Sequence, residues 1–243
     1  MRYLMDFSYS GQLFNGYQKQ PKLRCVQSEI ERVLTSINDN NSVSVYSAGR
    51  TDSKVNALHQ MAHFDLINEI DPYKLKGALN IYLPDDIYVN NITKVGDDFH
   101  ARYMVKEKTY EYLINTGLFN PLERNYVYQY CKSLNIDNMK KAIIYFKGTH
   151  DFTTFTCSED KRENKVRTIN KVSIKEKNGI IKITFHGKGF LKYQVRNMIG
   201  LLIKIGEGKF SPDIVPSLLS KKDRRCASIC APAEGLTLIN IKY

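Results

Sequence analysis

The most polar cluster of the chain is the run Ser47-Ala48-Gly49-Arg50-Thr51-Asp52-Ser53-Lys54. It follows a short apolar stretch typical of a strand, and loops at strand ends commonly carry catalytic groups. Gly49 lets the backbone turn or approach a ligand closely. Arg50 can bind a phosphate through parallel hydrogen bonds, and cations on both sides favour the ionised form of Asp52. The same pattern also fits a structural turn in which Asp52 caps a backbone N–H and pairs with Arg50.

Further along the chain, a few side chains can bind a ligand or move a proton. His100 and Arg102 stand two apart, and each is either a functional group or a locally paired structural residue. Tyr110 can stack on a base or lie in the core. His150 and Asp151 suggest a hydrolase, but no serine or cysteine nucleophile motif accompanies them, so a structural turn is the simpler interpretation.

A charged residue interrupts the most apolar helical pattern of the chain, which runs from Leu191 to Leu202. This residue, Arg196, either faces solvent or, if it faces inward, needs a buried carboxylate, because an unpaired buried charge costs several kcal/mol. His59 and His63 stand four apart like zinc ligands on a helix. Their surroundings favour a strand, however, and no third ligand is evident, so we expect no metal.

The overall composition indicates a basic protein with a substantial core. The 36 Lys and Arg residues outnumber the 25 Asp and Glu residues, which gives a net charge of +11 and fits a polyanionic partner such as nucleic acid. The five cysteines are scattered without a CxxC pair, so we expect reduced thiols. No apolar run approaches the roughly 20 residues of a membrane span, and Asp6 comes too early for a signal peptide. We therefore expect a cytoplasmic protein.

Hydrophobic periodicity predicts alternating strands and helices in both halves of the chain. The first half contains predicted strands at 2–9, 43–46 and 87–95, a helix at 26–37, and a helix that begins at Asp71-Pro72. The second half contains a strand at 110–114, a helix at 136–146, a hairpin through Asn178-Gly179, a helix at 191–202 and another that opens at Ser211-Pro212. We predict an α+β protein with an N-terminal half at 1–104 and a C-terminal half at 105–243.

Gly49-Arg50-Thr51-Asp52 is also the active-site signature GRTD of the tRNA pseudouridine synthases of the TruA family, which this sequence resembles over nearly its whole length. Tyr110 corresponds to the active-site tyrosine of that family. Other runs match in the same order: Gln60, His63-Phe64, Asn80, Leu83-Pro84-Asp85-Asp86, Phe99-His100-Ala101-Arg102, His150-Asp151-Phe152, Arg167, Gly189-Phe190-Leu191, Gln194-Val195-Arg196-Asn197, Gly200, Ala231-Pro232 and Gly235-Leu236-Thr237-Leu238.

The resemblance implies a pseudouridine-synthase fold. Two related α+β halves would join their antiparallel sheets into one extended mixed sheet with a central basic cleft, the N-terminal half carrying the catalytic loop and the C-terminal half completing the cleft. It further implies a homodimer that binds tRNA, uses no cofactor or metal, does not enter a membrane, and isomerises uridines at positions 38–40 of the anticodon stem-loop.

The resemblance also implies roles for individual residues. Asp52 would be the nucleophile or base, Arg196 would pair with it, and Tyr110 would stack on the uracil. The residues expected to bind RNA are Arg50, Lys54, His100, Arg102 and Arg167.

The sequence departs from the family in the catalytic loop. Lys54 replaces a glycine and Asn56 replaces a histidine, so the loop is expected to be reshaped if position 54 requires a positive φ. A different tRNA or ribosomal RNA uridine, and an RNA-binding protein without activity, therefore stay open as alternatives.

Overall fold

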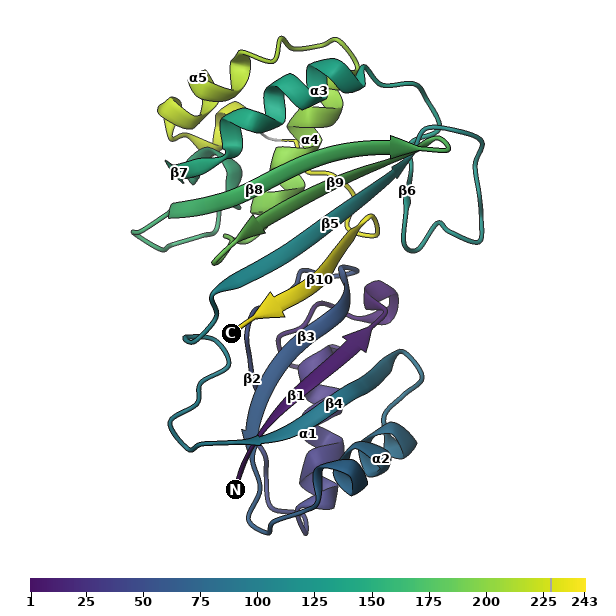
Figure 1. The fold of residues 1–243 in the computed structure, drawn as a ribbon, viewed down its shortest axis with the longest axis vertical. Helices are drawn as coiled ribbons and strands as arrows, with labels where there is room; N and C mark the ends of the chain where they lie inside the picture. The colour runs from purple at the N-terminus through teal and green to yellow at the C-terminus, as the bar shows by residue number, and fades with distance from the viewer. Residues whose placement is uncertain (228) are drawn as a thin grey trace. The chain divides into compact units, whose positions relative to one another are not determined.

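The computed structural model describes residues 1–227 and 229–243, which form two compact units. The first unit comprises Met1–Lys106 with Leu238–Tyr243, and the second comprises Glu107–Thr237. Each unit contains strands and helices, so the predicted α+β class is confirmed (Figure 1). The sequence placed the joint near residue 105 and kept the C-terminus with the second half, whereas the last six residues cluster with the first unit.

The sheet of the first unit has the strand order β4 (Ile87–Val95), β1 (Arg2–Tyr9), β3 (Asn56–Asp65) and β10 (Leu236–Lys242). Strand β1 is antiparallel to both β3 and β4. Its burial alternates strictly, with Tyr3, Met5, Phe7 and Tyr9 in the core. This alternation is the period of two that predicted the strand, because successive side chains of a strand point to opposite faces.

Helices α1 (Val26–Ile37) and α2 (Pro72–Tyr82) cover the core face of this sheet (Figure 1). Helix α2 begins as predicted, since the Asp71 carboxylate accepts hydrogen bonds from the amides of Tyr73 and Lys74, both at 3.1 Å. A short 3-10 turn, η1 (Gly11–Leu13), follows β1.

The strand predicted at 43–46 is wrong in extent, because only β2 (Tyr46–Ser47) pairs with β3. Val43 and Val45 are buried as the apolar pattern implied. Their amides, however, donate to the side chains of Thr35 and Glu31 on α1, at 3.2 and 3.1 Å. Hydrogen bonds to a helix thus replace the strand ladder that the pattern predicted.

The sheet of the second unit has the order β5 (Glu107–Asn115), β9 (Ile180–Gly187), β8 (Val166–Lys177) and β7 (Gly148–Asp151). These neighbours are antiparallel, while the short β6 (Tyr128–Gln129) runs parallel to β5, so the sheet is mixed. Strands β8 and β9 form the predicted hairpin. Asn178 and Gly179 both have positive φ, 54° and 75°, as a type I′ turn requires.

Helices α3 (Ile136–Ile143), α4 (Gln194–Gly206) and α5 (Ile214–Lys221) pack on one side of this sheet (Figure 1). Four short 3-10 turns accompany the helices in the described chain; besides η1 they are η2 (Ile144–Phe146), η3 (Thr153–Phe155) and η4 (Arg224–Ala227). In α4, 11 of 13 residues are buried, which explains its apolar sequence. Within the two described ranges, no helix is both long and apolar enough to cross a membrane.

His63 lies on the face of the first sheet that α1 and α2 do not cover. Its side chain is 2% exposed, and its Nδ1 accepts a hydrogen bond from the amide of Ala101 at 3.2 Å. Burial above all, together with the charges of His100 and Arg2, lowers the pKa of His63 to about 4. The imidazole is therefore neutral at physiological pH and serves as an acceptor that holds the segment around Ala101 on the sheet.

The burial of a neutral His63 predicts a loss of stability in mild acid. The unfolded chain binds a proton at this residue near pH 6.5 and the folded chain only near pH 4, so stabilisation is full above pH 6.5 and is lost as the pH falls. Between pH 7 and 5, the free energy of unfolding should fall by about 2 kcal/mol more in the wild type than in His63→Gln, which keeps an acceptor. Urea unfolding at both pH values measures this, and equal losses in the two proteins would contradict it.

Candidate active site

The loop that carries Asp52 is fixed by the residue just before it. Thr51 is buried, and its hydroxyl lies 2.7 Å from the hydroxyl of Tyr9 on β1. On the other side of Arg50, the carbonyl oxygen of Gly49 accepts hydrogen bonds from the Gln60 amide group and from the Ser47 hydroxyl, each at 3.0 Å. Buried or partly buried bonds therefore hold the backbone on both sides of Arg50.

These anchors determine which side chains of the loop reach solvent. With Thr51 turned into the core, its neighbours point outward, so Arg50 is exposed and Asp52 is half-buried. Burial raises the pKa of Tyr9 to about 12, which keeps its hydroxyl neutral and able to hydrogen-bond Thr51 throughout the physiological range. The arrangement presents a carboxylate and a guanidinium on one rigid turn.

The two departures from the TruA pattern have clear structural roles. Lys54 has a φ of 64°, so the loop does require the left-handed conformation that glycine adopts more readily. The amide of Val55 donates to the carbonyl of Asp52 at 3.2 Å and closes this turn. Asn56 is buried, and its side-chain oxygen accepts a hydrogen bond from the Gly11 amide at 2.8 Å. The loop therefore keeps a defined turn with lysine and asparagine at these positions.

His100 and Arg102 lie on a second loop of the first unit. The His100 ring contacts His63, with centroids 4.6 Å apart, and its Nδ1 accepts the amide of Arg102 at 3.1 Å. The Arg102 side chain is exposed. The Nδ1 atom of His59 lies at hydrogen-bond distance, 2.9 Å, from the Asp6 carboxylate, and His59 does not share a ligand set with His63.

In the second unit, Tyr110 lies on β5 opposite Phe185 and is 8% exposed. Its ring meets Phe190 edge to face, at 5.2 Å between centroids and 86° between planes. This contact restricts the orientation of the tyrosine ring.

Arg196 is one of only two residues of α4 that are not fully buried. Its Nε donates to the carbonyl of Ala231 at 2.8 Å, and the amide of Ala231 donates back to the carbonyl of Arg196 at 3.0 Å. The guanidinium also lies 5.1 Å from the centre of the Tyr193 ring, a cation–π contact. The side chain is thus held in place, unlike a lysine or arginine extended into solvent.

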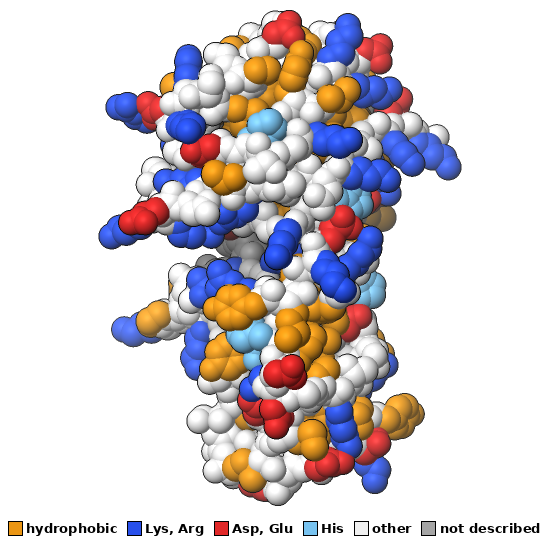
Figure 2. Space-filling model, turned by 60° about the vertical axis from the view of Figure 1, so that its left-hand side comes forward, with side chains coloured by type: hydrophobic (Ala, Val, Ile, Leu, Met, Phe, Trp, Pro, Cys, Tyr) orange, Lys and Arg blue, Asp and Glu red, His pale blue; other side chains and the backbone are white. Residues whose placement is uncertain are grey.

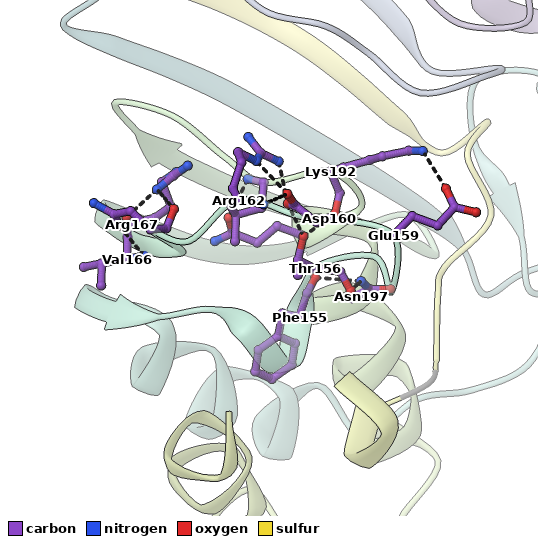
Figure 3. A network of polar contacts seen from close by, with 12 residues as sticks. Phe155, Thr156, Glu159, Asp160, Arg162, Val166, Arg167, Lys192 and Asn197 are labelled. Atoms are coloured by element: carbon purple, nitrogen blue, oxygen red, sulfur yellow. Dashed lines mark hydrogen bonds and ion pairs between the residues drawn. The ribbon is translucent and has the colours of Figure 1, made fainter. Parts of the chain in front are cut away.

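The polar run 158–163 is organised around one buried carboxylate, Asp160, drawn in Figure 3. Asp160 accepts hydrogen bonds from the Thr156 hydroxyl at 2.8 Å and from the Arg162 guanidinium at 2.6 and 2.8 Å. These bonds, above all those from Arg162, hold the pKa of Asp160 well below its usual range. The Asn197 amide group binds the carbonyl of Phe155 at 2.6 Å, which ties this segment to the residue that follows Arg196.

Arg167 on β8 is half-buried, and its guanidinium donates to the carbonyls of Val166 and Asn164 at 2.6 and 3.3 Å. His150 and Asp151 lie in β7, opposite Arg167 and Val166 of β8, so the turn predicted at these two residues is wrong. His150 bonds to the carbonyl of Lys147 and Asp151 accepts from Thr153, so the two side chains make separate local bonds. In the described part of the chain, no three His, Cys, Asp or Glu side chains are grouped as metal ligands.

The structure therefore groups the predicted residues in each unit separately. Arg50, Asp52 and Lys54 share one loop of the first unit, while Tyr110, Arg167 and Arg196 belong to the second. Sequence reasoning missed the anchoring pair Tyr9 and Thr51. The alternation of β1 placed Tyr9 in the core. Because a buried hydroxyl needs a hydrogen-bond partner, this burial could have indicated a contact of this kind, although not with which residue.

Comparison with known proteins identifies the family of the chain. The family model described as tRNA pseudouridine synthase matches residues 7–104 and 142–243. Proteins named tRNA pseudouridine synthase A from Streptococcus thermophilus (strain CNRZ 1066) and Streptococcus pyogenes serotype M49 are each 46% identical over 246 aligned residues, covering 100% of this chain and 99% of theirs. A solved Cbf5-Nop10-Gar1 complex aligns at 13% identity over 81% of this chain and 46% of that chain, with a TM-score of 0.35. Gly49-Arg50-Thr51-Asp52 lies within the matched region, and the chain belongs to the tRNA pseudouridine synthase family.

Proposed function

We propose that this protein isomerises uridine to pseudouridine in tRNA, with Asp52 as the essential carboxylate. One observation carries the proposal: the anchored loop presents Asp52 half-exposed beside the exposed Arg50, with Thr51 held inside by Tyr9. The full-length similarity to proteins named tRNA pseudouridine synthase A supports the choice of substrate. The turn at Lys54 supports a catalytic role for the loop. Lys54 replaces the family's glycine, but it has the positive φ that glycine adopts most readily.

The reaction breaks the bond between C1′ of the ribose and N1 of the uracil and joins C1′ to C5 instead. The proton on C5 is lost, and N1 gains one, so no atoms or electrons are exchanged with a co-reactant. Asp52 acts either by attacking C1′ as a nucleophile or by removing a proton from the sugar as a base. Both routes require an ionised carboxylate at the ribose and a uridine flipped out of its stack, which costs a few kcal/mol.

We assign supporting roles to two residues of the second unit, which would complete the cleft that the first unit begins. Arg196 would pair with Asp52 and keep it ionised. Its fixed position on α4 supports this role, because a restrained guanidinium loses little freedom on pairing. Tyr110 would stack on the uracil, and the edge contact with Phe190 supports a fixed ring plane.

We propose that RNA binds through its phosphates to the basic surface, at a target in the anticodon stem-loop at positions 38–40. The exposed Arg50, Lys54 and Arg102 are suited to phosphates, and His100 lies beside Arg102. Arg167 on β8 would act through its positive charge, because its guanidinium already donates to carbonyls of its own chain.

We place the reaction in the cytoplasm. The same loop could serve a uridine elsewhere in tRNA or ribosomal RNA, or bind RNA without reacting.

Replacing the carboxylate tests the reaction directly. With transcripts carrying tritium at C5 of uridine, Asp52→Asn should lower tritium release by about 10²- to 10⁴-fold or more, because the amide can act neither as nucleophile nor as base. RNA affinity should stay within about threefold, and the exposed Asp39→Asn should behave as the wild type. Wild-type protein that binds RNA without releasing tritium would favour the non-catalytic alternative. Mass-spectrometric mapping of the product would identify the modified position.

Removing the hydroxyl that anchors the loop tests whether loop rigidity is needed. Tyr9→Phe leaves the Thr51 hydroxyl without its 2.7 Å partner, a loss of about 1–3 kcal/mol, and should lower kcat about tenfold with little change in KM for RNA. Tyr3→Phe is the matched control, since it removes a buried hydroxyl bonded to Ile70, away from the loop. Its melting temperature should fall similarly while kcat is retained. An equal loss of kcat in both variants would show a general stability effect.

We also propose that the protein is a homodimer. Supporting this, the segment between β5 and β6 exposes large apolar side chains at Leu118 (94%), Phe119 (60%) and Leu122 (88%), and such concentrated exposure is typical of a surface that another chain covers. Light scattering should give a mass near twice 28.0 kDa. Leu118→Glu combined with Leu122→Glu should give the monomer mass, whereas Ile81→Glu on α2 should not; a monomeric wild type would refute the proposal.

A further inference from the structure

Four aromatic rings form a continuous cluster on the first unit, on the sheet face that α1 and α2 leave uncovered. Tyr46 on β2 pairs in register with His63 on β3, and their rings are nearly parallel, 5.1 Å apart at 19°. His100 contacts both of them, at 4.6 Å from His63 and 6.1 Å from Tyr46. Tyr103 packs on His100 with a centroid distance of 4.2 Å.

The two ends of this cluster are open to solvent although its centre is buried. Tyr46 is 51% exposed and Tyr103 is 73% exposed, while His63 between them is 2% exposed. The central rings are positioned by backbone contacts, since His63 binds the Ala101 amide and His100 binds the Arg102 amide. The exposed tyrosines are thus held by a rigid base, which lowers the entropy lost when a ligand stacks on them.

Arginines and the candidate catalytic loop lie close to the cluster in sequence. Arg102, between His100 and Tyr103 in sequence, is exposed, and Tyr46 begins the strand that leads within four residues to the exposed Arg50. On the face of the first unit drawn in Figure 2, hydrophobic side chains lie beside a histidine, with Lys or Arg side chains close by. Exposed rings next to cations are the combination that binds single-stranded RNA, where bases stack and phosphates pair.

We infer that Tyr46 and Tyr103 form a stacking platform for an unpaired RNA base beside the target uridine. The inference rests on the proposed function, which supplies RNA as the ligand and a uridine as the target. Its role would be distinct from that of Tyr110, because Tyr110 would hold the reacting uracil while the platform would hold a neighbouring base. Stacking is tolerant of sequence, since every base has a flat π face, so the platform would position the strand without selecting a particular base.

The test measures binding and base stacking separately from the reaction. The probe is an RNA hairpin with a uridine-containing loop and 2-aminopurine beside the uridine, whose fluorescence is quenched when it stacks on a ring. Tyr46→Leu and Tyr103→Leu should each weaken binding about 5- to 100-fold and relieve the quenching seen on binding. Tyr46→Phe and Tyr103→Phe keep the rings and should stay within about twofold of wild type. Tyr73→Leu, at an 84% exposed tyrosine on α2, is the matched control.

The outcomes distinguish this inference from the proposed function. If the wild type releases tritium from uridine but the two leucine variants bind and quench like Tyr73→Leu, the platform is refuted and the enzyme assignment stands. If the leucine variants weaken binding and the wild type forms no pseudouridine, the platform stands on an RNA-binding protein. Tyr→Phe variants as weak as the leucine variants would also refute stacking, because the ring would then be irrelevant. Melting temperatures of all variants identify any loss caused by unfolding.

Discussion

The buried hydrogen bond between Tyr9 and Thr51 is the constraint on which the candidate site depends. A hydroxyl removed from water must find a partner, and Thr51 finds one on β1, 42 residues earlier in the chain. With Thr51 fixed inward, its neighbours are the accessible residues, since Arg50 is exposed and Asp52 is half-buried. The position and the exposure of Asp52 thus follow from the inward placement of Thr51, to which no step of the reaction is assigned.

The same logic explains the second unit, where polar groups inside apolar surroundings fix the candidate residues. Helix α4 is buried almost throughout, yet Arg196 and Asn197 stand side by side in it. Asn197 binds the backbone of Phe155, and Arg196 binds the backbone of Ala231. Both residues satisfy carbonyls of segments distant in sequence, so the helix holds together the loops that surround it while it orients the guanidinium.

Much of the fold was predictable because the decisive information is local. Alternation identified β1, the Asn178-Gly179 pair identified the hairpin of β8 and β9, and Asp71 identified the start of α2. The strand predicted at 43–46 failed because its amides bond to Thr35 and Glu31, a tertiary contact that no periodicity records. In the candidate site, the motif identified Asp52, but it could not reveal Tyr9 as the anchor, since that pairing joins residues far apart in the chain.

The departure at Lys54 and Asn56 shows why a motif is better judged by backbone conformation than by residue identity. Lysine at a φ of 64° costs on the order of 1 kcal/mol relative to glycine, an amount that the surrounding contacts must offset. Those contacts are present: the carbonyl of Phe14 accepts from both the Lys54 amide and the Ser53 hydroxyl, and Asn56 binds Gly11. Contacts from Phe14 and Gly11 therefore hold the turn next to Asp52 in the left-handed conformation, although a lysine occupies the position.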